Sequence, residues 1–194
     1  MAHFAGWQKH LHLFAESVWG EFPGGTGFHL PYAEYDVRPR VATHQANLFT
    51  GLRQRRHHRV VRATLQGRLE CPLFSYHAAG KSIAEHLLSW LLSAPDGLNL
   101  DSYSCKLFES GVDDKLHLGL RPTSGALSGG ADSPSLRLSL QLEGREEQGG
   151  VAVPALSPTA PRPTEFLFKD VVFTVAGEPV ELRSFEVRVN NRLE

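Results

Sequence analysis

The stretch Val60-Val61-Arg62-Ala63-Thr64-Leu65-Gln66-Gly67-Arg68-Leu69-Glu70-Cys71 decides the fold of this chain. Its odd positions are small or apolar, and the even positions from Arg62 to Glu70 are polar. A period of two predicts a strand with one face on a core and the other face in water. Gly67 interrupts the apolar row, which predicts a bulge or a bend at that position.

A helix is predicted directly after this strand. Ser82-Ile83-Ala84-Glu85 has the pattern of a capping box, in which the Ser82 hydroxyl accepts a hydrogen bond from the amide of Glu85 and the carboxylate reaches back. Apolar residues then recur at helical spacing, and Pro95-Asp96-Gly97 ends the helix. The apolar stripe consists of Ile83, Leu87, Leu88, Leu91 and Leu92.

Most of the remaining chain reads as strands. Extended or alternating patterns occupy residues 28–41, 98–109, 116–120, 136–142, 166–175 and 180–189. Many alternating strands with a single strong helix predict a mainly β protein, an antiparallel β sandwich or open barrel with one flanking α-helix.

We expect one domain over residues 1–194, because this length suffices for one sizeable core. Residues 1–27 are predicted to form an N-terminal arm, with a short helix or docking segment near residues 7–19. Residues 122–135 and 144–164 are rich in Gly, Ser and Pro and are predicted as long loops.

Composition excludes several classes of protein. The formal net charge is −1, which argues against binding of nucleic acid through bulk charge. The chain has two cysteines, and Cys71 falls in an apolar row, so we expect a buried thiol in a reducing compartment. The longest apolar run is far shorter than the roughly 20 residues of a membrane span, and no signal peptide is evident. We therefore expect folding in a cytoplasm.

Gly80-Lys81-Ser82 follows a strand and opens a helix, as a phosphate-binding loop does. The full pattern requires a further glycine where this chain has Ser75. The strands also alternate in the antiparallel manner, whereas phosphate-loop sheets are parallel with continuously apolar strands. Lys81 and Ser82 are therefore predicted as helix-start residues, and a nucleotide-dependent enzyme using Lys81 is a minor alternative.

The ten histidines are scattered without metal-ligand spacing. Neither a nucleophile elbow nor a paired-carboxylate site is present. We therefore predict no catalytic residues, no metal and no cofactor.

A basic run precedes the organising strand, and it includes Arg53, Arg55, Arg56 and Arg59. Acidic residues that could pair with it occur later in the chain. Patches of opposite sign on one small protein favour head-to-tail packing between copies. We therefore predict a subunit interface made by Arg53, Arg55, Arg56, Arg59, Glu143, Glu146 and Glu147.

The order of segments resembles the tail tube proteins of long-tailed bacteriophages and of contractile injection systems. The resemblance depends on Asn47–Arg53 before the strand Arg59–Glu70, then the loop and helix Gly80–Leu92, then the closing strand Val180–Val189 followed by Asn190-Asn191. It implies a ring of identical subunits that stacks into a hollow tube, with six copies for single-lobe relatives and three for double-lobe ones. It also implies a place in the virion tail.

The resemblance further implies partners. Genomic DNA and the tape-measure protein would occupy the lumen, and tail terminator and tail-tip proteins would bind the ends. Because DNA carries one charge per about 1.7 Å, unpaired arginines in the bore would bind it. We therefore expect the arginines of the basic run to be paired across subunits, and we expect residues 144–164 to span successive rings.

Alternatives remain open at this point. Within the same class, the chain could be the inner tube of a contractile system or a tail terminator. From another class, it could be a small-ligand-binding β barrel of lipocalin type, which would need an open apolar interior.

Overall fold

A computed structural model describes residues 9–24, 27–46, 57–75, 77–78, 81–92, 101–109, 115–150 and 164–191. In this part of the chain, every strand pair is antiparallel and α1 (Ile83–Leu92) is the single α-helix. Nine strands of the described residues form one sheet that does not close on itself. The predicted class, a mainly β antiparallel sandwich or open barrel with one flanking helix, is confirmed.

The sheet bends into two layers, and both layers use β8 (Lys115–Gly130). The first half of β8 pairs with β7 (Tyr103–Glu109) and β10 (Glu146–Gly149). Its second half pairs with β9 (Ser133–Gly144) and β13 (Ser184–Asn190). The remaining strands are β1 (Lys9–Ala15) and β2 (Phe28–Leu30) beyond β7, and β4 (His57–Pro72) and β3 (Glu34–Ala46) beyond β9.

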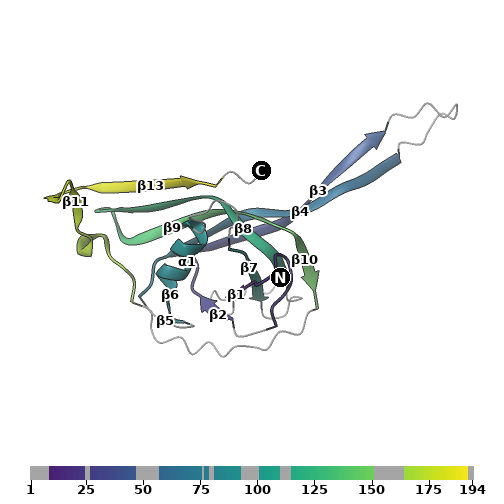
Figure 1. Cartoon of the computed structure of the whole chain (residues 1–194), viewed down its shortest axis with the longest axis horizontal. Helices are drawn as coiled ribbons and strands as arrows, with labels where there is room; N and C mark the ends of the chain where they lie inside the picture. The colour runs from purple at the N-terminus through teal and green to yellow at the C-terminus, as the bar shows by residue number, and fades with distance from the viewer. Residues whose placement is uncertain are drawn as a thin grey trace, which may run out of the picture.

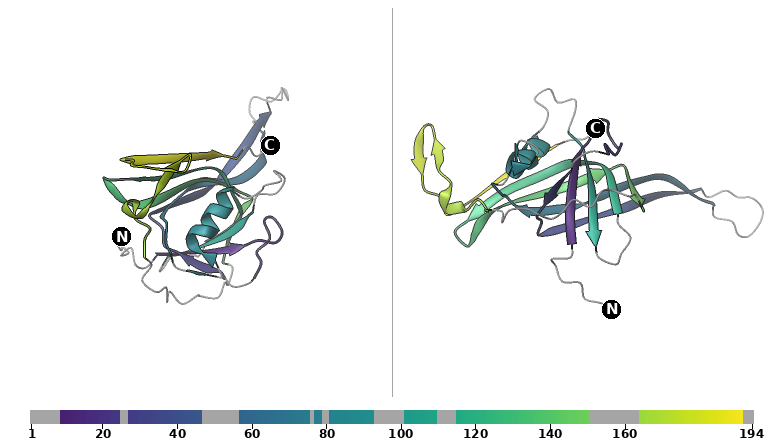
Figure 2. Two further views of the ribbon diagram at one scale, coloured as in Figure 1. Left: turned by 60° about the vertical axis from the view of Figure 1, so that its left-hand side comes forward. Right: turned by 90° about the horizontal axis from the view of Figure 1, so that it is seen from below.

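The helix α1 follows a two-stranded ribbon of β5 (His77–Ala78) and β6 (Lys81–Ser82), and it packs between the layers (Figure 2). His86 stacks on Phe28 of one layer, while a Cβ atom on Gly125 of the other layer would come within 2.7 Å of Leu91. The predicted capping box is confirmed. The Ser82 amide donates to Glu85 Oε2 at 2.6 Å, and the Glu85 amide donates to Ser82 Oγ at 3.1 Å.

Side chains of both layers and of α1 fill the interior. The central strand contributes Leu65, Leu69 and Cys71, all fully buried, as its alternation predicts. Burial raises the pKa of the Cys71 thiol to about 12, so it stays protonated. In the part of the chain that is described, the space between the layers is filled, whereas a lipocalin-type barrel would need it open. The facing side chains include Leu87, Trp90, Leu91, Leu138 and Leu140.

Two elements project from the body at opposite ends (Figure 1). β3 and β4 pair along their whole length, and their far ends, where Ala46 lies opposite His57, extend past the other strands as a two-stranded arm. At the other end the chain forms a 3-10 turn, η2 (Phe168–Asp170), and a hairpin of β11 (Phe173–Val175) and β12 (Glu178–Val180). No helix of the described residues is long and apolar enough to cross a membrane.

The helix predicted near residues 7–19 is wrong, because residues 9–15 form β1 between β2 and β7. Leu11 and Phe14 suggested helical spacing because both faces of this strand are buried. Phe22 packs edge-on against Phe14, 5.1 Å between ring centroids, and so helps to cover the second face.

The loop predicted at 122–135 is also wrong, since β8 runs to Gly130 and β9 starts at Ser133. Its small residues are packing sites: a Cβ atom on Gly129 would come within 2.9 Å of the Phe185 ring. Of the loop predicted at 144–164, residues 146–149 form β10, and 151–163 lie outside the described residues. Within the strand region predicted at 166–175, only Phe173–Val175 is a strand, because η2 interrupts it.

A bulge or a bend was predicted at Gly67, and the structure has no bulge or register shift at this position. Gly67 keeps the regular register between Val37 and Leu142, and the irregularity of the β3–β4 pair lies between Ala42 and Thr43. A Cβ atom on Gly67 would clash with the backbone of Asp36 and Val37. Glycine is therefore needed here for close approach of two strands.

Candidate subunit interface and polar face

The layer β13-β8-β9-β4-β3 has one apolar face toward the core and one polar face toward solvent. The polar face follows from the same period of two that buries the leucines, because successive side chains of a strand point to opposite faces. Register places its polar residues in rows across the strands, such as Asp36, Arg68, Gln141 and Ser124. Its charged side chains include Glu34, Asp36, Arg38, Arg40, Arg68, Glu70, Arg137, Glu143, Glu186 and Arg188.

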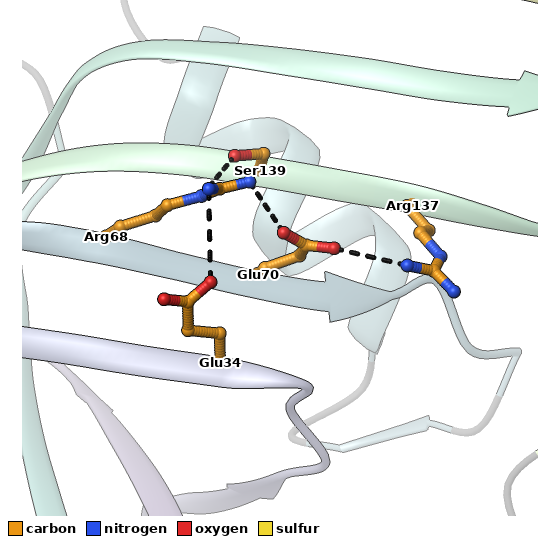
Figure 3. A network of polar contacts seen from close by, with 5 residues as sticks. All are labelled: Glu34, Arg68, Glu70, Arg137 and Ser139. Carbon is orange, nitrogen blue, oxygen red and sulfur yellow. Dashed lines mark hydrogen bonds and ion pairs between the residues drawn. The ribbon is translucent and has the colours of Figure 1, made fainter.

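An ion-pair network joins β3, β4 and β9 on this polar face (Figure 3). Glu34 and Glu70 are opposite each other on β3 and β4, an arrangement that repels. Arg68 bridges them, with 2.6 Å to Glu70 Oε2 and 3.9 Å to Glu34 Oε2. Arg137 approaches the other oxygen of Glu70 at 3.4 Å, and Arg68 Nε donates to Ser139 Oγ at 3.1 Å. Each guanidinium thus lies beside a carboxylate of its own chain.

The same pairing recurs along the edge strands. Arg38 lies 2.5 Å from Asp36, and Arg188 lies 2.8 Å from Glu186. Exposed pairs of this kind contribute little to stability, typically below about 1 kcal/mol. Their main effect is to balance the charge of a polar surface. The surface is also hollowed over β3, β4, β8 and β9 by a polar groove of about 680 Å³.

The polar layer ends in β3 and β13, and neither of these strands has a neighbour on its outer side among the described residues. Four successive antiparallel pairs separate these strands, so β3 and β13 run in the same direction. Pro39 lies within β3 opposite Leu65, and proline is tolerated in an edge strand where no neighbour needs its missing N–H.

Hydrogen bonds at the two ends of β13 identify which of its backbone groups face outward. The Asn191 amide donates to Thr123 O at 2.8 Å, and Arg183 O accepts from the Ala131 amide at 3.0 Å. Odd-numbered residues of β13 therefore face β8, because backbone direction alternates along a strand. The N–H and C=O groups of the even-numbered residues point to the open edge: Ser184, Glu186, Arg188 and Asn190.

Only some of the predicted interface residues can be placed. Arg53, Arg55 and Arg56 lie outside the described residues, and Arg59 belongs to the part of β4 within the arm. The acidic set lies at the base of the arm, because Gly144 pairs with Leu65 where the arm joins the body. Its members are Glu143 on β9 and Glu146 and Glu147 on β10.

Glu147 already has partners within its own chain. Its carboxylate accepts from His117 Nε2 at 3.1 Å and lies 3.4 Å from Lys115 Nζ. On the other side, the Tyr35 hydroxyl donates to His117 Nδ1 at 2.5 Å, a role that the neutral imidazole allows. Burial lowers the pKa of His117, against the opposing effect of Glu147. Tyr35, His117 and Glu147 thus connect β3, β8 and β10.

A profile of the phage tail tube protein family matches residues 6–194, nearly the whole chain. The chain belongs to the phage tail tube protein family. The predicted resemblance is therefore confirmed at the level of the family. Comparison with curated proteins finds no match.

One solved structure supports a shared fold for this tail tube family member, and a second shows a weaker likeness. A chain in the cryo-EM structure of the anti-feeding prophage baseplate, 6-fold symmetrised, superposes with a TM-score of 0.51 at 11% identity, covering 79% of this chain and 99% of that one. A chain of the anti-feeding prophage tube-terminating cap gives a TM-score of 0.47 at 8% identity, covering 78% and 93%.

Family membership indicates a structural protein of a phage-type tail. The structure places Lys81 in the two-residue antiparallel strand β6. The Ser82 hydroxyl accepts a hydrogen bond from the Glu85 amide at the start of α1. Among the described residues, His, Cys, Asp and Glu side chains form no group of three that could hold a metal.

Two features of this tail tube chain were missed from the sequence. The ion-pair network depends on register: Arg68 and Arg137 come from strands far apart in the chain, and only pairing of β4 with β9 brings them together. The Tyr35–His117 bond crosses between layers. The available signal for the network was the polar half of each alternating strand, which is charged on both β4 and β9.

Proposed function

We propose that this chain is the repeating subunit of a phage tail tube, in which the polar layer lines the bore. The single observation that carries this proposal is the polar face of β13-β8-β9-β4-β3, where four arginines lie beside carboxylates of the same chain: Arg38, Arg68, Arg137 and Arg188. A bore that conducts DNA must be wetted yet must not hold phosphates. Polar, charge-balanced side chains meet both requirements, and the groove over this face suits a curved wall.

The edges β3 and β13 support ring formation. A half-buried sheet with two open edges invites pairing with another chain. Pairing β13 of one copy with β3 of the next would extend the layer around a closed ring. Because β3 and β13 run in the same direction, this joint would be a parallel pair, while every strand pair in the described part of the subunit is antiparallel.

The finer assignments belong to the same proposal. We propose a single domain over 1–194 and six copies in each ring, the symmetry applied to the anti-feeding prophage baseplate. Genomic DNA and the tape-measure protein would occupy the lumen, terminator and tip proteins would bind the ends, and assembly would occur in the host cytoplasm. An inner tube of a contractile system and a tail terminator are the alternatives within this class, because their subunits would also use open edges.

Proline at the open edge tests ring formation. The Arg188 N–H points away from β8, so Arg188→Pro removes a donor from the edge without removing a β8–β13 hydrogen bond. We expect the variant to fold with a free energy of unfolding within about 1 kcal/mol of the wild type. We also expect it to lose rings and tubes in negative-stain images and to sediment as a monomer.

Two controls separate this effect from others. Arg188→Ala removes the same ion pair but keeps the N–H, so it should still assemble. Val187→Pro removes a hydrogen bond to β8 and should lower the free energy of unfolding by about 3 kcal/mol. Normal rings from Arg188→Pro would refute the role of β13, and a wild type that stays monomeric at every concentration would refute the tube function.

A further inference from the structure

Two projecting elements of opposite charge lie at opposite ends of the molecule (Figures 1 and 2). We name residues 38–46 and 57–62 the basic arm and residues 168–182 the acidic hairpin. The basic arm has four arginines and no acidic residue. The two elements lie at opposite ends of the sheet. The basic arm reaches the end where Ala46 pairs with His57. The acidic hairpin precedes β13, which begins beside Gly130 at the turn between β8 and β9. The arginines of the arm are Arg38, Arg40, Arg59 and Arg62.

The acidic hairpin has three carboxylates, from Asp170, Glu178 and Glu181, against the single Lys169. Glu178 and Glu181 are exposed and make no ion pair with another described residue. They contrast with Asp36, Glu70 and Glu186 on the polar face, which lie beside guanidiniums. The negative charge of the hairpin is therefore available to a partner.

The acidic hairpin also exposes apolar side chains. The exposed fraction is 78% for Val172, 66% for Val175 and 42% for Leu182. Val172 and Leu182 border a groove of about 500 Å³ whose lining also includes Phe168, Pro179 and Val180. A contiguous exposed apolar patch on a small protein marks an interaction surface, and the carboxylates beside it favour a basic partner over nucleic acid.

We propose that the acidic hairpin of one copy binds the basic arm of the next copy. This inference rests on the proposed tube function and adds its axial contact. The two elements of one molecule cannot meet, because the whole length of the sheet lies between them. A contact between unlike surfaces at opposite ends is head-to-tail, so it repeats from copy to copy and builds a stack. β13 and the part of β3 outside the basic arm, residues 34–37, stay available for the ring.

Charge reversal in two complementary variants tests the contact. Variant A is Glu178→Lys/Glu181→Lys, and variant B is Arg59→Glu/Arg62→Glu. Alone, each variant places like charges at the contact, so we expect rings with loss of tubes in negative-stain images. In an equimolar mixture, each end of A meets an opposite charge on B, so we expect tubes to return. The matched control, Glu21→Lys/Asp101→Lys, makes the same charge change as variant A at exposed positions outside both elements and should form tubes.

The outcomes separate the two proposals. Three results would overturn the axial contact: tubes from A or B alone, no recovery of tubes on mixing, or loss of tubes in the control. Rings in these experiments would leave the proposed tube function intact. A wild type without rings or tubes overturns the tube function itself. The dependence of wild-type tube length on salt concentration is a further test that needs no variant. Raising the NaCl concentration should shorten wild-type tubes before rings dissociate, because exposed charges are screened, and salt-independent tube length would contradict the contact.

Discussion

At the scale of single residues, Gly67 allows β3 and β4 to approach closely in the middle of the polar layer. A methyl group there would overlap the Asp36 carbonyl and the Val37 backbone, and strand backbone cannot yield as a side-chain tip can. We predict that Gly67→Ala lowers the free energy of unfolding by about 3 kcal/mol or more, measured by urea denaturation. Gly149→Ala is the control, since nothing lies within 4 Å of its added carbon, and it should change stability by less than about 0.5 kcal/mol.

His117 makes stability depend on pH. Its pKa is lowered in the folded protein, mainly by burial, with Glu147 opposing and Lys115 adding to the shift. The unfolded chain therefore binds a proton more readily, so this contribution is present above the unfolded pKa of about 6.5 and is lost as pH falls through the folded value. Tyr35 and Cys105 also face the ring, and burial keeps both protonated through this range.

We predict that wild-type stability falls on acidification from about pH 7.5 to 5.5 more steeply than that of His117→Gln. At pH 7.5 the variant should be less stable by about 1–3 kcal/mol, because Tyr35 and Glu147 lose hydrogen-bond partners. Urea denaturation at both pH values measures the difference. Equal pH dependence of the two proteins would show that His117 does not carry the effect.

At the scale of elements, the end of β13 is fastened to the end of α1. The Asn191 side-chain amide donates to the carbonyl of Leu91, in the last turn of α1, at 2.9 Å, and to that of Pro122 at 3.2 Å. The sequence suggested that the closing strand ends in asparagine but did not suggest what the amide binds. The Asn191 amide thus donates a hydrogen bond to the Leu91 carbonyl, which has no hydrogen-bond donor within the helix because it lies in the last turn.

Asn191→Ala should therefore lower the free energy of unfolding by about 1–2 kcal/mol. Asn190→Ala is the matched control, since the Asn190 side chain is exposed, and it should be nearly neutral. Hydrogen exchange gives a second measurement: amides of β13 and of the last turn of α1 should exchange faster in Asn191→Ala alone. Equal protection in both variants would mean that the amide does not hold the strand.

At the scale of the whole molecule, the charge balance of the polar face determines how it meets DNA. Glu70 lies beside both Arg68 and Arg137, so Glu70→Gln leaves these two guanidiniums with weaker partners. We predict that the variant binds fluorescent DNA about tenfold more tightly than the wild type at low salt. The slope of log affinity against log salt should become steeper by about 1–2, one for each freed arginine.

Glu21→Gln removes one charge from an exposed position outside the polar face and should leave DNA affinity unchanged. Anisotropy of labelled DNA across a salt series measures both proteins. If the two variants bind DNA equally, net charge and not the ion-pair network governs the interaction, and the argument for a bore lined by paired arginines fails.

The sequence by itself determined the elements in which local pattern and burial agree. The alternation from Val60 to Cys71 and from Leu136 to Leu142 predicted β4 and β9, and the capping box predicted the start of α1. These patterns succeed because one face of each element meets core and the other meets water. They failed at β1, where both faces are buried, and along the Gly/Ser-rich part of β8, where small residues make room for α1 and β13.

Only the tertiary structure decided what the strands do together. Register across β3, β4 and β9 placed Arg68 between Glu34 and Glu70, and no local pattern encodes which rows of a sheet come into line. The order of strands left β3 and β13 as open edges with the same direction, and it set the basic arm and the acidic hairpin at opposite ends. Pairing of distant segments fixes these features, because contacts between strands depend on the path of the whole chain and not on the composition of any one stretch.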